Sequence, residues 1–309
     1  MIRKILVPVD GSGFAECALP MALSLAEKTG GEVRLDMVNE PANLPPGVWA
    51  EAFLANHSKY LDAITDEVAE RAGPHTTVSS VLLEGDVARS LDGEVEASGA
   101  DLVVMSTHGH GGLARVWLGS VADAVLRNCP VPVLLVRPSE DEKGDPTGAE
   151  GASRIVVPLD GSPFAEAAIG PALEMARLFA ADVMLLRAVS YPVMVSSYLP
   201  DTIEENQAYI RHAESEADAY LDDVSSRFED RHIALAKAVV VSPQPALAIL
   251  DHVGETKADF VVMASHNRHG VARVVLGSVA DKVVRGSHTP VLIVHQPAKA
   301  PRTRAEGAA

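Results

Sequence analysis

The segment DLVVMSTHGHGGLARVWLGSVAD (101–123) returns later in the chain as DFVVMASHNRHGVARVVLGSVAD (259–281). Each copy runs from an apolar stretch through a small, polar loop into a Gly-Ser pair that can begin a helix. Glycine-rich loops and helix N-termini both present backbone N–H groups to an anion. The repeated segment therefore bears on the fold and on binding together.

The repeat extends over most of the chain. KILVPVDGSGFAECAL (4–19) matches RIVVPLDGSPFAEAAI (154–169) at a shift of 150, whereas the segments quoted above are 158 apart. We expect the additional residues in the 190–202 region of the second copy. A unit of about 150 residues has the size of a whole domain, not of a solenoid repeat. The sequence predicts a domain at 1–138, a linker at 139–153, a domain at 154–297 and a disordered tail at 298–309.

Short apolar runs alternate with stretches of helical spacing in each copy. Parallel strands need long crossovers, which are usually helices. The sequence therefore predicts an α/β protein with two tandem doubly wound domains, each a five-stranded parallel sheet with helices on both faces. In the first copy we expect strands at 5–9, 33–38, 77–83, 101–106 and 131–136, and helices at 13–28, 48–72, 87–98 and 119–127.

Composition excludes several classes of function. The chain has 309 residues and a formal net charge of −16, which disfavours nucleic acid and anionic membranes as partners because both require a basic face. No apolar run approaches the roughly 20 residues of a membrane span, and the N-terminus leads directly into a strand without a signal peptide. These features predict a cytoplasmic protein. Cys17 and Cys129 lack metal-ligand spacing and are expected to be buried thiols.

One aspartate follows the first strand in each copy. Asp10 comes directly after ILVPV, and Asp160 after IVVPL, each opening an Asp-Gly-Ser turn into a helix. In a parallel sheet, ligands bind beyond the carboxyl ends of the strands. A carboxylate there can cap the helix or accept hydrogen bonds from a sugar hydroxyl, and the spacing leaves both interpretations open.

The loop Ser106–Gly112, which leads to Gly119-Ser120, has the features of a phosphate-binding loop. Its glycines allow close approach of the backbone to a ligand, and the following helix adds its positive end. It is not the loop of the P-loop enzymes, because no lysine precedes Ser120. Its position after an apolar strand and before a helix, in two copies, favours phosphate binding.

These residues resemble the universal stress protein family. The resemblance rests on VPVDGS and on DLVVMSTHG…GGL…LGSVADAVLRNCPVPVLLVR, and it covers about 4–137 and 154–295. Nucleotide-binding members carry G-x2-G-x9-G-[ST]. Here Ser106 replaces the first glycine, and Gly109 and Gly119-Ser120 fit the rest. In the second copy, Ala264 and Asn267 replace both leading glycines before Gly277-Ser278.

The resemblance implies that the domains bind ATP, accompanied by Mg²⁺, and it supports the first site more strongly than the second, where both leading glycines are replaced. It implies ribose contacts by Asp10 and Asp160 and adenine contacts by the backbone near Val38 and Val189. The implied binding frame comprises Pro8, Ser106, Thr107, His108, Gly109, His110, Gly111, Gly112, Gly119, Ser120 and Val121 in the first copy, and Pro158, Ala264, Ser265, His266, Asn267, Gly277, Ser278 and Val279 in the second.

The resemblance also implies pairing of the two last strands, which would remove two exposed edges, and it allows a homodimer of whole chains. The residues favour a regulatory binding protein over an enzyme. No histidine base is placed beside Ser12 or Ser162, so no catalytic residue is assigned. The His-x-His at 108–110 lacks the further ligands of a metal site, and none is predicted. Slow ATP hydrolysis or phosphotransfer, and a nucleotide-free interaction module, are the alternatives.

Overall fold

The computed structural model describes residues 2–40, 48–107, 118–138, 152–190, 200–228, 232–266 and 276–296. The centres of both glycine-rich loops, most of the predicted linker and the predicted tail lie outside these ranges.

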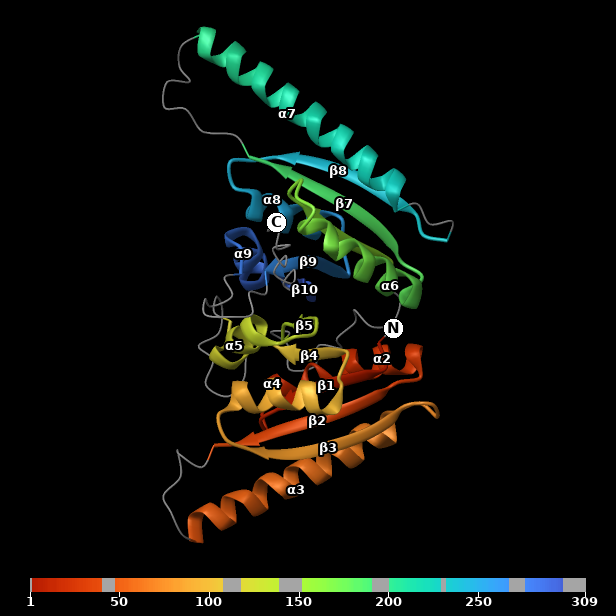
Figure 1. Cartoon of the computed structure of the whole chain (residues 1–309), viewed down its shortest axis with the longest axis vertical. Helices are drawn as coiled ribbons and strands as arrows, with labels where there is room; N and C mark the ends of the chain where they lie inside the picture. Colours follow the sequence, from red (N-terminus) through yellow and green to blue (C-terminus); the bar gives the residue numbers. More distant parts are fainter. Residues whose placement is uncertain are drawn as a thin grey trace, which may run out of the picture.

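Strands and helices alternate in both halves of the molecule (Figure 1). The first half contains β1 (Lys4–Val9), α1 (Gly13–Glu16), α2 (Leu19–Thr29), β2 (Glu32–Asn39), α3 (Val48–Arg71), β3 (Thr77–Glu84), α4 (Val87–Ser98), β4 (Leu102–Ser106), α5 (Ser120–Asn128) and β5 (Val133–Val136). The second contains β6 (Arg154–Leu159), the 3-10 helix η2 (Ala165–Ala168), α6 (Ile169–Phe179), β7 (Asp182–Val189), α7 (Pro200–Arg227), β8 (Leu235–Val241), α8 (Pro245–Glu255), β9 (Phe260–His266), α9 (Ser278–Gly286) and β10 (Val291–Gln296).

The strands form one continuous sheet with the order β3-β2-β1-β4-β5-β10-β9-β6-β7-β8. Within each half all neighbouring strands are parallel, which confirms the predicted fold class. The halves meet where β5 and β10 pair antiparallel, with Leu134 opposite Leu292. The pairing expected of the two last strands is therefore present.

Helices cover both faces of the sheet because strand side chains alternate between two apolar cores. Ile5 and Val7 of β1 join one core with α2 and α3, whereas Leu6 joins the other core with α4 and α5. Each core continues across the β5–β10 junction into the second half, where α6 and α7 lie on the first side and α8 and α9 on the second. The two domains are consequently joined by shared cores as well as by strand pairing.

Two details differ from the sequence-based expectation. The predicted helix at 13–28 is broken after Glu16, because Pro20 has no N–H to donate to the carbonyl four residues before it. The additional residues of the second copy are not confined to 190–202. Part of the extra length lies in α7, which has 28 residues where α3 has 24.

The carboxyl ends of the outer strands of both halves face one side of the molecule. Figure 1 shows the arrows of β2, β3, β7 and β8 all pointing to the left. Any site beyond those strand ends in either half therefore opens on the same face. None of the helices within the described ranges is both long and apolar enough to cross a membrane.

Candidate functional site

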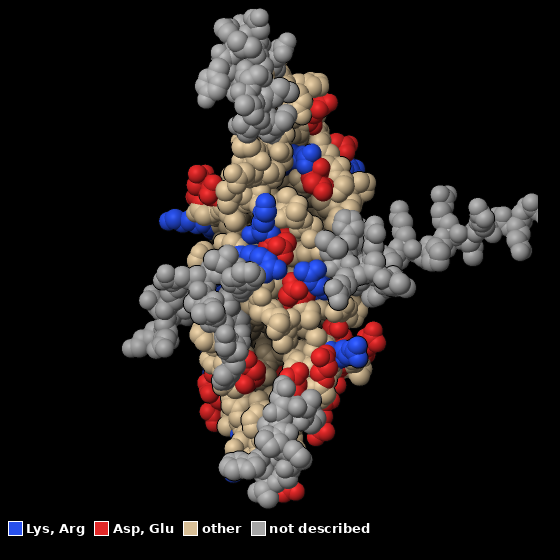
Figure 2. All heavy atoms as spheres, turned by 90° about the vertical axis from the view of Figure 1, so that its left-hand side faces the viewer, with Lys and Arg blue, Asp and Glu red and all other residues tan. Residues whose placement is uncertain are grey.

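The candidate sites lie at the carboxyl ends of β1 and β4 and of their counterparts β6 and β9. In each half the chain builds the sheet outward from β1 in one direction and then returns to its other side with β4, so the strand order reverses between them. Such a switch point is where parallel α/β sheets bind ligands. Figure 2 looks onto this face, where basic and acidic side chains lie together near the middle.

Asp10 shapes the turn that follows β1. Its Oδ1 accepts hydrogen bonds from the backbone N of Ser12 at 2.9 Å and from the Ser12 hydroxyl at 2.5 Å. The Ser12 oxygen in turn accepts from the backbone N of Ala15 at 3.2 Å, so Ser12 is the N-cap of α1. One Asp10 oxygen thus orders the turn, and the Asp10 side chain is exposed at the switch point of the sheet.

Asp160 forms the same turn after β6. Its Oδ1 accepts from the backbone N of Ser162 at 2.9 Å and from its hydroxyl, and the Ser162 oxygen accepts from the backbone N of Ala165 at 3.1 Å. Glycine is required between them, since Gly161 has φ +86° and Gly11 has φ +80°. The capping interpretation holds for the serine rather than for the aspartate in the first half, because Ser12 is the N-cap of α1 and Asp10 orders the turn through Ser12.

Thr107 closes the base of the first glycine-rich loop. Its backbone N donates to the carbonyl of Val136 at 3.0 Å, and its own carbonyl accepts from the backbone N of Gly119 at 2.9 Å. The end of β4 and the start of α5 are therefore held together while residues 108–117 connect them. This closure fixes where the loop leaves and re-enters the fold.

The helices after both loops begin with exposed backbone donors. Gly119 is the N-cap of α5 and Gly277 is the N-cap of α9. Neither glycine has a side chain that could accept a capping hydrogen bond from the helix. Ser120 and Ser278, the first helical residues, are exposed. Val121 and Val279, the second helical residues, are partly buried and pack against the core. Uncapped donors at a positive helix end suit a phosphate.

Ser106 and Ala264, which stand at the first glycine position of the G-x2-G-x9-G-[ST] pattern, face the core. Ser106, buried, forms a side-chain hydrogen bond with Cys17, and Ala264 packs against the same core. The halves then diverge, because β9 stays paired with β10 through Ser265 and His266, whereas β4 pairing ends at Ser106. Ser265, predicted to belong to the second binding site, is a buried strand residue in the structure, and its counterpart Thr107 is also buried but lies beyond the end of β4.

The predicted adenine contacts do not occupy equivalent places. Val38 is the last residue but one of β2, whereas Val189 ends β7, so the counterpart of Val189 is Asn39. Pro8 and Pro158 lie within β1 and β6, two residues before the aspartates. Backbone near the ends of β2 and β7 nevertheless lies beside the aspartate turns, through the β1–β2 and β6–β7 pairings.

Several predicted residues lie outside the described ranges: His108, Gly109, His110, Gly111, Gly112 and Asn267. For His266 only the backbone is described. Among the His, Cys, Asp and Glu side chains that the structure describes, no three gather in a way that could hold a metal ion. Both cysteines are free thiols, and burial raises the pKa of Cys129 to about 12.

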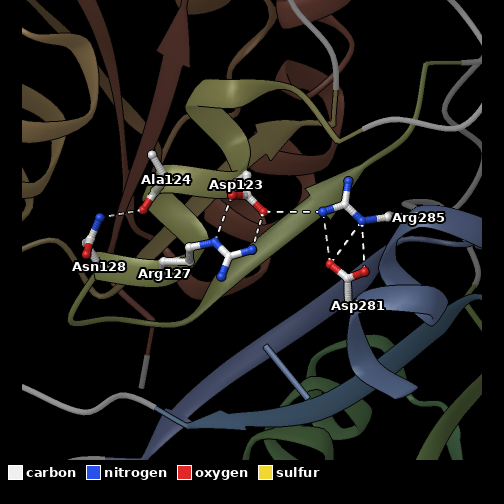
Figure 3. A network of polar contacts seen from close by, with 6 residues as sticks. All are labelled: Asp123, Ala124, Arg127, Asn128, Asp281 and Arg285. Atoms are coloured by element: carbon white, nitrogen blue, oxygen red, sulfur yellow. Dashed lines mark hydrogen bonds and ion pairs between the residues drawn. The ribbon is translucent and has the colours of Figure 1, made fainter. Parts of the chain in front are cut away.

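An ion network joins the two helices that follow the loops (Figure 3). On α5, Arg127 donates from Nε to Oδ2 of Asp123 at 2.7 Å. On α9, Arg285 donates from Nε to both carboxylate oxygens of Asp281, at 2.9 and 3.0 Å. Arg285 also extends Nη2 to within 3.4 Å of Oδ1 of Asp123, which connects the two domains. The Arg127 bond holds the pKa of Asp123 below its ordinary value.

Sequence reasoning missed this bridge and also Arg187 of β7, which lies against the Asp160 turn. The Asp-x3-Arg spacing of 123–127 and 281–285 predicts pairs within each helix, but not their contact across the domain boundary. A charged residue within the apolar strand LLRAV was the available signal for Arg187. Burying a charge in a strand is costly, so such a residue needs a reason.

Comparisons with known proteins agree with this fold. The family model described as the universal stress protein family matches residues 1–137 and 151–295. A universal stress protein of Mycobacterium tuberculosis (strain H37Rv) is 28% identical over 316 residues, covering 95% of each chain. One of Mycolicibacterium smegmatis is 29% identical over 302 residues, covering 94% of this chain and 96% of the relative. These relatives span both halves, as this chain does.

Solved structures show the same architecture. The crystal structure of a universal stress protein from Archaeoglobus fulgidus has a TM-score of 0.68 at 18% identity, covering 94% of this chain and 98% of that one. A putative universal stress protein from Pseudomonas aeruginosa has a TM-score of 0.62 at 20% identity, covering 95% and 93%. At these identities the likeness concerns the fold.

Proposed function

The chain belongs to the universal stress protein family, and on that premise we propose that it is a cytoplasmic, ATP-binding regulatory protein of the stress response. The proposal assigns it no catalytic residue. Ser12, beside the first candidate site, donates its hydroxyl hydrogen to Asp10 and accepts from the backbone N of Ala15 as a helix cap, so its oxygen is already engaged in the turn. Binding, rather than turnover, is therefore the proposed activity.

The observation that carries the proposal is the uncapped start of α5 opposite the Asp10 turn. A buried strand pair and the Thr107–Gly119 hydrogen bond fix this helix end at the switch point of the sheet. Its N-cap, Gly119, has no side chain that could accept from the first N–H groups of the helix. A polyphosphate would satisfy those donors and interact favourably with the helix dipole.

The proposed ligand would span the two elements. Asp10 would accept hydrogen bonds from the ribose, and the backbone at the end of β2 would contact the adenine. The N–H groups of Ser120 and Val121, with the loop 107–112, would hold the phosphates. Mg²⁺ would arrive with the nucleotide, since the described residues supply no carboxylate cluster for it. Because the protein carries a net charge of −16, it would repel a nucleotide that is partly neutralised by Mg²⁺ less than it would repel the free nucleotide.

Titration calorimetry with ATP and Mg²⁺ tests the proposal. The variant S120D places a carboxylate at the first position of α5, where the dipole stabilises it but a phosphate is repelled. The matched variant S278D does the same at α9. We expect the native chain to bind ATP, S120D to lose the tighter site and S278D to keep it. Absence of binding by the native chain at millimolar ATP with Mg²⁺ would overturn the proposal.

A further inference from the structure

Arg187 gives the second domain a cation that the first domain lacks. It pairs with Leu159, the last residue of β6, and is thus adjacent to the strand end that carries Asp160. In the first half the corresponding residue, paired with Val9, is Met37, which is 3% exposed. The two otherwise repeated sites therefore differ in charge next to the aspartate.

The guanidinium of Arg187 lies against the Asp-Gly-Ser turn. Its Nη1 donates to the carbonyl of Leu159 at 3.2 Å. Its Nη2 is so close to Gly161 that a Cβ built there would lie 3.3 Å away. The head group therefore reaches past the strand end to the turn itself, and the side chain is half-buried rather than directed into bulk solvent.

The neighbouring charges leave Arg187 available. Tyr220 donates to Glu166 at 3.1 Å, and Arg227 contacts the same carboxylate at 2.9 Å, so Glu166 is already neutralised. Among the described residues Arg187 donates only to Leu159, and no ion pair joins it to Asp160. The Asp160 carboxylate and the Arg187 guanidinium thus both contact the Asp-Gly-Ser turn or the strand end before it, and no ion pair joins them among the described residues.

We propose that the second domain binds adenine nucleotides that carry a phosphate on the ribose 2′ or 3′ oxygen. The proposal rests on the nucleotide-binding function proposed above. Asp160 would accept a hydrogen bond from the remaining ribose hydroxyl, and Arg187 would donate to the ribose phosphate. In dinucleotide-binding folds a carboxylate selects the free hydroxyl, and an arginine nearby accommodates a 2′-phosphate. Bonds from a guanidinium to a phosphate are charge-assisted and among the stronger ones in proteins.

The same comparison assigns the first domain a nucleotide with both ribose hydroxyls free, because Met37 offers no donor beside Asp10. The second domain has also lost the glycine at the position of Gly109, where Asn267 stands. The two changes are consistent with each other, since a ligand anchored by its ribose phosphate depends less on the glycine-rich loop. The repeat then encodes two ligand classes in one fold.

The test uses three probes with the S120D chain, in which only the second domain can bind phosphate. ADP and adenosine 2′,5′-bisphosphate carry the same number of phosphates, and adenosine 3′,5′-bisphosphate distinguishes the two ribose positions. We expect one bisphosphate to bind about 10- to 100-fold more tightly than ADP. The variant R187Q, which keeps a donor but loses the charge, should reduce this preference to below threefold. R187K should retain part of it, and the S278D chain should show none.

The outcomes separate this inference from the proposed function. If the S120D chain binds ADP and both bisphosphates equally, or binds none of them, while the S278D chain binds ATP, the inference is wrong and the proposed function stands. A bisphosphate preference that survives R187Q also overturns it. If neither chain binds any nucleotide, both proposals fail. Loss of the preference in R187Q, with thermal stability unchanged, supports the assignment of Arg187.

Discussion

Arg285 and Asp123 come from different domains, yet Nη2 of the arginine lies 3.4 Å from Oδ1 of the aspartate. Asp123 belongs to the first turn of α5, and its backbone N donates to the carbonyl of Gly119 at 2.8 Å. The bridge therefore ends one turn below the helix end proposed to hold phosphate. It connects the α9 helix of one site to the α5 helix of the other.

A double-mutant cycle with D123N and R285Q should measure this bridge. The side chains are 30% and 26% exposed, so solvent screening limits their interaction. We expect a coupling free energy of about 0.5–1 kcal/mol in denaturant unfolding at low salt, decreasing at high salt. Additive effects of the two substitutions would show that the contact contributes nothing to the association of the domains.

The two roles of Asp10 can be separated by D10N and D10A. Asparagine keeps an Oδ1 that can accept from Ser12, whereas alanine removes the acceptor. We expect D10N to change stability by less than about 0.5 kcal/mol but to weaken ATP binding about tenfold, because the charged acceptor for the ribose is lost. D10A should in addition cost about 1 kcal/mol of stability. Unchanged ATP affinity in D10N would show that the charge of Asp10 does not contribute to nucleotide binding and that its role is to order the turn.

A buried carboxyl makes the first domain sensitive to pH. Asp36 of β2 is fully buried, and it shares Arg34 with Glu94 of α4: Arg34 lies 3.3 Å from Asp36 and 2.6 Å from Glu94. Burial raises the pKa of Asp36 to about 7, against the opposing effect of Arg34. The unfolded chain loses this proton near its ordinary pKa of 3.8, whereas the folded chain retains it. Stability therefore falls as pH rises from about 4 to about 7 and is lowest above that range.

The variant D36L, which introduces the leucine found at the equivalent position 186, should remove this dependence. The gain in unfolding free energy over the native chain should be larger at pH 8 than at pH 5, by roughly 2 kcal/mol. D36N is the matched control for shape. Denaturant titrations at the two pH values measure the difference, and an equal gain at both would mean that Asp36 does not titrate in this range.

The variant G109N tests whether the sequence difference between the two glycine-rich loops affects binding, because it gives the first domain the asparagine that the second domain has at position 267. Asparagine adopts left-handed backbone more readily than most residues but places a side chain where the phosphates would pass. We expect ATP affinity of the first domain to fall about tenfold with little change in thermal stability, because loops contribute little to the core. Unchanged affinity would show that the loop differences between the copies are neutral.

The fold was predictable because its signals are local. Apolar runs such as ILVPV and helical spacing located the described strands and most helices within a few residues. The break after Glu16 was not predicted, because the apolar spacing of Phe14 and Leu19 continues across it. Pro20 interrupts only the backbone hydrogen bonds of the helix. The length of α7 was not predicted, because its mostly polar sequence shows little apolar periodicity.

The candidate sites were predictable only in part. The Asp-Gly-Ser turns and the Gly-Ser helix starts are contiguous in sequence, and the structure brings them to the same edge of the sheet. Contacts between distant elements carry no local signal. Arg187 reaches Gly161 only because β6 and β7 pair in register, and Arg285 reaches Asp123 only because β5 and β10 join the halves. Substitutions between otherwise matching repeats, such as Met37 and Arg187, were the remaining clue.

Because the two halves belong to one polypeptide, the β5–β10 junction always joins one copy of each domain. Domains that assemble from separate polypeptides form like and unlike pairs according to their concentrations, and each surface must tolerate every combination. Here a single translation product always supplies one copy of each domain, already paired. The two halves are thereby released from the requirement of self-complementarity, and each can specialise without losing its partner.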